Sequence, residues 1–146
     1  MDTIERILQE KGRQVHTVRP GATVLEAVEA MCAAKVGAVL VCDGGTCVGI
    51  FSERDLMTRV ILEHRDPRTM PVGDAMSRDV VVVEPETSTN EAMAIMTERR
   101  LRHLPVVEGG KVAGVVSIGD LVRWNSRHQQ FHIRMLTNYI TGQYPG

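Results

Sequence analysis

Apolar positions along this chain follow two periods, and their order predicts a repeating set of short elements. Apolar side chains at helical spacing predict helices over residues 4–11, from Thr23 onward and over 52–64. Residues 36–42 and 47–51 are nearly continuous apolar runs, which is typical of buried strands. Asp43-Gly44-Gly45 between them predicts a hairpin turn. With a short extended piece at 14–18, the order is helix, strand, helix, strand, strand, helix.

The same order starts again near residue 72, after a polar segment at 65–71 that contains Pro67 and Pro71 and predicts a linker. A fixed spacing of 65 residues with the same turn residues indicates an internal duplication. We therefore expect one unit at 1–64, a second at 65–126 that includes the linker, and a tail at 127–146. The residues that repeat those 65 positions earlier are Val80, Val83, Pro85, Glu91, Ala92, Met96, Val106, Gly109, Gly110, Gly114, Ser117, Asp120 and Leu121.

Residues 122–141 predict a further helix, which residues 126–128 could interrupt. Phe131, Met135, Leu136 and Tyr139 fall at helical spacing, so this C-terminal tail should be amphipathic. We expect its apolar face to cover the core or to bind a partner protein.

The overall composition excludes several function classes. A formal net charge of -1 gives no reason to expect nucleic acid as a partner, and no apolar stretch is long enough to cross a membrane. The first residues do not resemble a signal peptide, so a cytoplasmic location is expected. Cys42 and Cys47 flank the first hairpin turn and could face each other across it. A disulfide or metal site there is the less favoured reading for a reducing cytosol.

Three sequence marks recur in a fixed order: Val72-Gly73-Asp74-Ala75-Met76, Arg102-His103-Leu104-Pro105-Val106, and Gly-x-x-Ser-x-x-Asp at the end of each unit. Together they resemble the CBS domain, and the resemblance covers about residues 5–125. It is nearest to small stand-alone bacterial CBS pairs of the signal-transduction type. The resemblance implies an α+β fold, with two βαββα repeats packed with pseudo-two-fold symmetry and followed by a C-terminal helix.

The Ser-x-x-Asp sequence at a helix start can bind a nucleoside phosphate. Free backbone N–H groups beside a Ser hydroxyl bind anions, and an Asp one turn later can accept both hydroxyls of a ribose. The resemblance implies these roles for Ser52 with Asp55 and for Ser117 with Asp120. The alternative is a plain capping box, in which the same side chains satisfy amides at the helix end.

Further candidate residues come from their positions relative to the resemblance. Arg102 and His103 precede a strand where related modules hold phosphate, and this role is favoured over a solvated Arg and a structural His. Arg54 could add a phosphate contact in the first site or could equally be a solvated side chain on the helix surface. Adenine would lie against backbone and apolar walls, with residues 11–16 equivalent in the other site. The same apolar residues are also what a core needs. The candidate walls are Met76, Val80, Val81, Ile50 and Val115.

No nucleophile with a base partner, zinc-ligand pattern or Gly-rich phosphate loop is evident, so the sequence favours a protein that is not an enzyme. We expect an adenine-nucleotide sensor without an obligatory cofactor. Its ligand would be AMP, ADP, ATP or NAD, ahead of S-adenosylmethionine. It would act as a homodimer on a separate, unknown effector protein. The alternative is a ligand-free scaffold that binds a partner through the tail from Trp124 onward.

Overall fold

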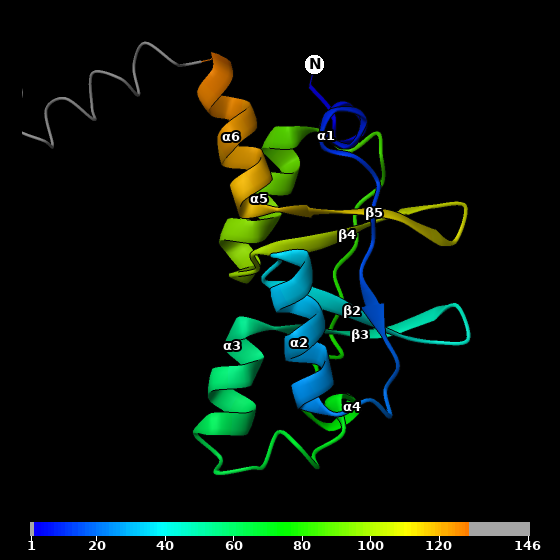
Figure 1. Ribbon diagram of the computed structural model, residues 1–146. Helices are drawn as coiled ribbons and strands as arrows, with labels where there is room; N and C mark the ends of the chain where they lie inside the picture. The colour runs from blue at the N-terminus through cyan, green and yellow to red at the C-terminus, as the bar shows by residue number, and fades with distance from the viewer. Residues whose placement is uncertain (1, 129–146) are drawn as a thin grey trace, which may run out of the picture.

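The computed structural model describes residues 2–128, and the amphipathic segment expected around Phe131 and Tyr139 lies outside them. The described part is a mixed α+β structure in which both predicted hairpins and the helices around them are present (Figure 1). The first unit comprises α1 (Ile4–Lys11), β1 (Thr17–Val18), α2 (Val24–Ala34), β2 (Ala38–Asp43), β3 (Thr46–Ser52), α3 (Glu53–Asp55) and the π-helical η1 (Leu56–Ile61). The second comprises α4 (Val72–Ala75), α5 (Thr89–Arg99), β4 (His103–Glu108), β5 (Lys111–Ser117) and α6 (Ile118–His128).

The strands form two small sheets. In the first, β1 pairs parallel with β2, and β2 pairs antiparallel with β3; in the second, β4 and β5 form a hairpin. The prediction of a strand at the start of the second unit was wrong, because the segment around Val83 meets β4 only through a single parallel bridge to Val106. Two backbone hydrogen bonds, from Val83 N–H to the Pro105 carbonyl and from Val107 N–H to the Val83 carbonyl, hold it there.

Both hairpins turn on a pair of glycines. Gly44 and Gly45 have φ of 59° and 91°, and Gly109 and Gly110 have φ of 60° and 78°. Positive φ at both central residues is the requirement of a type I′ turn, whose twist matches that of the flanking strands. The repeated Gly-Gly therefore explains why both hairpins have the same register.

The helices begin where the capping residues predict. Thr23 and Ser88 accept hydrogen bonds from the amides of Glu26 and Glu91, at 3.1 and 3.0 Å. The helix expected over 52–64 is instead a short α-helical turn, α3, that continues as the π-helical η1 and ends at Ile61. His64, in the turn that follows, is in the left-handed region with φ 55°. Residues 126–128, where an interruption was allowed for, are helical in α6, which the structure describes as far as His128.

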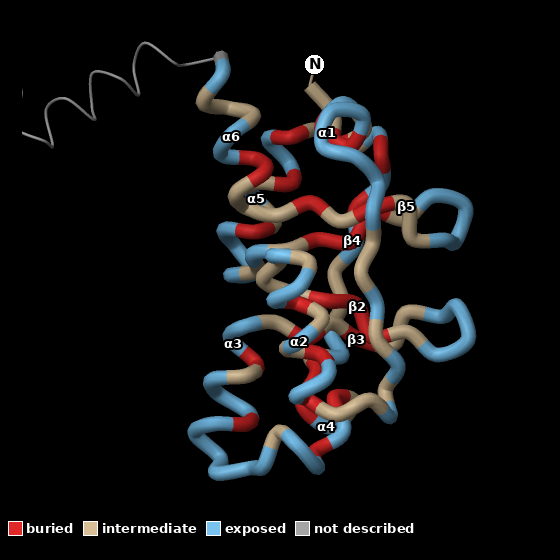
Figure 2. Tube along the Cα trace, in the orientation of Figure 1, coloured by how far each residue is buried: buried red, intermediate tan, exposed pale blue. Residues whose placement is uncertain are grey.

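The core consists of two clusters, and each unit contributes its first helix to the cluster of the other. Ile4, Ile7 and Leu8 of α1 pack with Leu104, Val106 and Val116 of the second unit, whereas Val72 and Ala75 of α4 pack with the first. Figure 1 shows α1 beside β5 and α6, and α4 at the opposite end. The buried stretches in Figure 2 lie on the strands and on the helix faces turned toward them, and the hairpin turns are exposed.

The exchanged helices explain the glycine in each Gly-x-x-Ser-x-x-Asp sequence. A Cβ at Gly114 would lie 2.9 Å from Cδ2 of Leu8, and a Cβ at Gly49 would lie 2.5 Å from the Met76 sulfur. Both distances are shorter than ordinary van der Waals contacts, and a Cβ at Gly49 would also lie 2.8 Å from the Ser77 carbonyl oxygen. Glycine therefore lets the crossing segment approach the strand without displacing these atoms. Glycine at these two positions brings the start of the other unit against the Ser-x-x-Asp turns.

Candidate functional site

The second Ser-x-x-Asp sequence forms a closed cap at the start of α6. The Ser117 hydroxyl accepts a hydrogen bond from the Asp120 amide at 3.1 Å, and Asp120 Oδ2 accepts one from the Ser117 amide at 2.8 Å. Asp120 is only 7% exposed. The capping-box geometry considered as an alternative is therefore present, and it holds a buried carboxylate at the helix start.

Two basic side chains contact the Asp120 carboxylate. Lys11 Nζ lies 2.7 Å from Oδ2 and also donates to the Val115 carbonyl at 2.9 Å, while Arg123 donates to Oδ1 at 2.6 Å. Burial by itself raises the pKa of Asp120, but the hydrogen bonds from Lys11 and from the Ser117 amide outweigh it, so the pKa lies below its ordinary value. The group is an anion at neutral pH, as an acceptor for ribose hydroxyls must be.

The first Ser-x-x-Asp sequence forms the same cap with different neighbours. Asp55 Oδ2 accepts from the Ser52 amide at 3.0 Å and from its hydroxyl at 3.1 Å. Oδ1 accepts the Ser77 hydroxyl at 2.9 Å and lies 3.6 Å from Arg59 Nε. Asp55 is thus held by a neutral hydroxyl where Asp120 is held by the ammonium of Lys11.

Each cap opens onto a cleft between the two units, and the two clefts differ in size. The first, about 160 Å³, contains Ser52 and Asp55 with the chain at 100–103; the second, about 520 Å³, contains Ser117 and Asp120 with the chain at 34–40. In the first cleft the backbones of Ser77 and Ile50 pair through hydrogen bonds of 2.8 and 2.9 Å. Gly12 occupies the position of Ser77 in the other unit, has no hydroxyl to offer Asp120, and hydrogen-bonds back to Leu8 instead. The second cleft is therefore the larger of the two.

Positive charge gathers in the second cleft. Lys11, Lys35 and Arg123 line it, against the single carboxylate of Asp120. Lys35 follows α2 in the left-handed conformation, with φ 58°, and Arg100 follows α5 with φ 56° at the edge of the first cleft. A surplus of cations around a helix start favours a phosphorylated ligand.

His103 lies between the clefts and lines both. Burial lowers its pKa; Glu53 opposes that effect and Arg102 adds to it. Its imidazole is thus neutral at physiological pH, and it gains a charge only in more acidic solution than an ordinary histidine would. In the second cleft, His103 is a neutral polar side chain of the wall and not a cation.

The structure distributes the sequence candidates over both clefts. Arg54, Arg102 and His103 lie with Ser52 and Asp55, Val115 lies with Ser117 and Asp120, and Ile50 lines both. Residues 11–16, expected as the second wall, contribute Lys11, Gly12, Gln14 and His16. Met76, Val80 and Val81 line neither cleft: Met76 is in the first core and Val81 packs on the second.

Sequence reasoning missed Lys35 and Arg123. Lys35 and Arg100 occupy equivalent positions at the 65-residue spacing, and both follow a helix. A comparison of the two units for basic residues at equivalent positions would therefore have identified Lys35. Arg123 has no basic counterpart at Thr58, and its role depends on the turn of α6 toward Asp120.

Comparison with known proteins agrees with this architecture. The family model of the CBS domain matches residues 11–62 and 72–127. The chain belongs to the CBS-domain family. Tandem CBS domains are typically regulatory, ligand-binding modules and are generally not catalytic. Within residues 2–128 no cluster of three or more His, Cys, Asp or Glu side chains could hold a metal ion, and no described helix could span a membrane.

Several relatives are similar over most of their length. The mitochondrial CBS domain-containing protein CBSX3 of Arabidopsis thaliana is 34% identical over 151 residues, covering 97% of this chain and 73% of that protein. YhcV of Bacillus subtilis is 36% identical over 74% of this chain and 76% of its own. The crystal structure of ATU1752 from Agrobacterium tumefaciens is 40% identical, with a TM-score of 0.81, and covers 84% of this chain and 98% of that one.

Proposed function

We propose that this CBS pair is a non-catalytic regulatory module that binds one adenine nucleotide (AMP, ADP, ATP or NAD) in the second cleft. The observation that carries the proposal is a single cleft that combines sufficient volume, a buried carboxylate at a helix start and a surplus of basic side chains. Each of these features matches one part of a nucleotide.

The volume and the walls suit a nucleoside. About 520 Å³ falls within the 300–1,000 Å³ typical of small-molecule sites. Apolar side chains of Val36, Leu40, Ile50 and Val115 line it, and they can hold a flat, weakly polar base between them. Asp120, ionised and at the base of the cleft, is the acceptor for the ribose hydroxyls, which would share it with Lys11 and Arg123.

The basic groups suit the phosphates. The Ser117 hydroxyl and the first amides of α6 lie beside Asp120, and Lys11, Lys35 and Arg123 line the same cleft. A phosphate there would gain both hydrogen bonds and charge neutralisation.

The first cleft differs from the second in its volume and in the availability of its carboxylate. Its volume of about 160 Å³ is below the range for a drug-sized ligand, and Ser77 already occupies Asp55 Oδ1. The proposal is therefore one nucleotide per chain.

The output would pass to a separate effector protein, from a homodimer in the cytoplasm. A hexameric CBS-CP12 protein from bloom-forming cyanobacteria, 29% identical with a TM-score of 0.73, is a precedent for assembly of such pairs. The CBS pair of MJ0100, 18% identical, was solved with 5′-methylthioadenosine and S-adenosyl-L-methionine. At that identity the likeness concerns the fold, so our ligand assignment rests on the charge and volume of the cleft.

The test is isothermal titration calorimetry of nucleotide-free protein with AMP, ADP, ATP and NAD, using two matched variants. Lys35→Asn removes a cation from the second cleft, and Arg100→Asn removes its counterpart from the first. Both residues are exposed in the left-handed conformation that Asn tolerates, so both variants should fold. We expect about one nucleotide per chain. Lys35→Asn should weaken its affinity by about three- to tenfold, and Arg100→Asn should leave it unchanged.

Each alternative outcome has a defined meaning. Weaker binding in Arg100→Asn alone would place the nucleotide in the first cleft and refute the assignment. Absence of heat and of thermal stabilisation with all four nucleotides would refute nucleotide binding and favour the ligand-free scaffold.

A further inference from the structure

The first hairpin brings two cysteines directly opposite each other. In the β2–β3 register, Asp43 pairs with Thr46 next to the Gly-Gly turn, and Cys42 pairs with Cys47 as the following position. In a two-residue hairpin the closing pair exchanges hydrogen bonds, so the following pair is of the non-hydrogen-bonded kind, with Cα atoms about 4.5 Å apart and side chains on the same face. That separation lies within the roughly 4.4–6.8 Å that a disulfide spans.

The electrostatic environment of Cys42 agrees with a neighbouring thiol. Burial raises the pKa of Cys42, and the neighbouring Cys47 raises it further by its charge and by a hydrogen bond between the two side chains. Cys47 also donates to the Gly49 carbonyl at 3.6 Å, a weak sulfur contact that a disulfide could replace at small cost. A β-bulge follows the pair, between Val41 and Cys42, and gives the strands local freedom to adjust.

The second hairpin shows what the fold itself needs at these positions. At the 65-residue spacing, Val107 and Val112 replace the two cysteines, and they pair in the same register beside the same kind of bulge. The fold therefore requires only a pair of small apolar side chains here. The chemistry of two thiols is an addition to the first unit alone.

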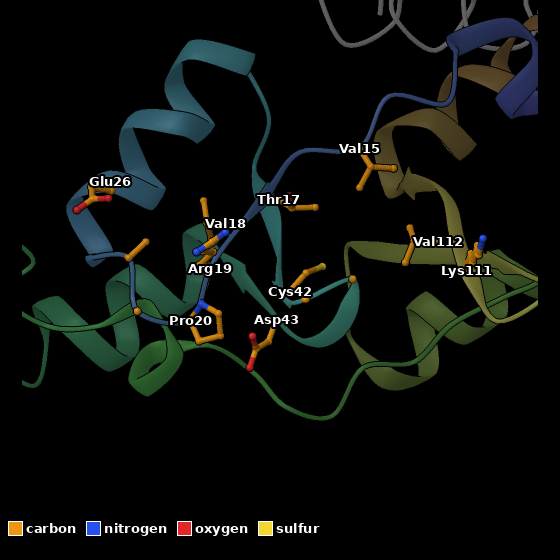
Figure 3. A pocket seen from close by; sticks show the side chains of 14 residues that line it. Val15, Thr17, Val18, Arg19, Pro20, Glu26, Cys42, Asp43, Lys111 and Val112 are labelled. Atoms are coloured by element: carbon orange, nitrogen blue, oxygen red, sulfur yellow. The ribbon is translucent and has the colours of Figure 1, made fainter.

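Solvent reaches Cys42 through an open groove between the two hairpins. The groove has a volume of about 1330 Å³ and is lined by Cys42 and Asp43 on one side and by Lys111 and Val112 on the other. Figure 3 shows Cys42 at the end of its strand among these residues, opposite the second hairpin. A small oxidant can therefore reach this thiol without unfolding.

We propose that Cys42 and Cys47 form a reversible intramolecular disulfide when the protein meets a hydroperoxide. One thiolate attacks the peroxide oxygen, which breaks the O–O bond and gives a sulfenic acid and, with hydrogen peroxide, one water. The second thiolate attacks that sulfur, the S–S bond forms, and the hydroxyl leaves as a second water. Two thiols lose two electrons and two protons, and the hydroperoxide takes them up.

The experiment treats the reduced full-length protein with excess hydrogen peroxide at about pH 8.5, near the ordinary pKa of a thiol, and then blocks remaining thiols with N-ethylmaleimide. Cleavage after Lys35 and Arg54 gives one peptide, residues 36–54, that contains both Cys42 and Cys47 and separates them from Cys32. We expect this peptide to be two hydrogens lighter than its reduced form and to carry no maleimide. After reduction with dithiothreitol and a second treatment with N-ethylmaleimide, both of its cysteines should be labelled. Cys32, which is exposed, has no cysteine partner in the part of the chain described and should remain outside any disulfide within the chain.

Two variants serve as controls. Cys47→Val introduces the residue of the second hairpin, so it should fold, and it should abolish the mass loss and leave Cys42 open to sulfinic acid formation. Cys32→Ser should leave the mass loss unchanged. Three results with the oxidised wild-type protein would overturn the proposal: maleimide on both Cys42 and Cys47, sulfinic acid at either of them, or a disulfide that joins Cys32 to one of them.

Discussion

Asp120→Asn tests whether the charge of a buried carboxylate stabilises the cap of α6. The amide keeps an oxygen for the Ser117 N–H but loses the charge that strengthens this bond and the one to Lys11. A hydrogen bond to a charged group contributes about 1 kcal/mol more than a neutral one, and the Lys11 ion pair is discounted because that side chain is 37% exposed. Arg123, 70% exposed, is not counted. We expect a loss of about 2 kcal/mol in the free energy of unfolding at pH 7.

The assay is urea unfolding, in which a loss of that size moves the midpoint by about 1 M. Because the pKa of Asp120 is lower in the folded protein than its ordinary 3.8, its stabilisation is complete above about pH 3.8 and disappears as the pH falls through the folded pKa. The gap between wild type and variant should therefore close in acid.

Asp66→Asn is the matched control for this pH dependence. Its hydrogen bonds with Arg68 also lower the pKa of Asp66, but the side chain is exposed, so we expect no measurable change in midpoint. A gap for Asp120→Asn that persists unchanged below the folded pKa would refute the electrostatic reasoning, since the loss would then come from packing.

Two further predictions concern the residues around the clefts. Because burial lowers the pKa of His103, the folded protein resists protonation of this side chain, and the free energy of unfolding should fall as the pH drops below about 6.5. In urea unfolding between about pH 7.5 and 5.5, His103→Gln should make this pH dependence weaker. An unchanged pH dependence would count against a buried neutral imidazole. Ser77→Gly removes the hydroxyl that donates a hydrogen bond to Asp55 and should lower the free energy of unfolding by about 1.5–3 kcal/mol. Equal stability of variant and wild type would show that water replaces the hydroxyl.

Much of this fold follows from local patterns in the sequence. The Gly-Gly turns, the apolar runs beside them and the capping residues each act within a few positions, and the structure confirms the hairpins, the helix starts and the extent of the first helix, residues 4–11. Because the chain contains the unit twice, each of these local patterns could be recognised in two places. Where it failed, at Val83, strand pairing depended on a partner far along the chain, and only one bridge formed.

The site was less predictable because it is built across the two units. The exchange of α1 and α4 brings Lys11 to Asp120 and Ser77 to Asp55, contacts that span 109 and 22 residues. No periodicity within one unit indicates them. Met76 and Val81 were predicted to line a cleft, but their apolar side chains pack in or against the core clusters instead.

The positions at which the two units differ are the informative ones, because the fold tolerates both residues there. Gly12 against Ser77 leaves one cleft open and the other narrowed, and Val107 with Val112 against Cys42 with Cys47 separates an inert hairpin from one with paired thiols. A residue that the fold demands, such as Gly49 with Gly114, recurs in both units. A residue present in only one unit is free to serve binding or redox chemistry, and this chain therefore contains, within itself, the control for each of its proposed sites.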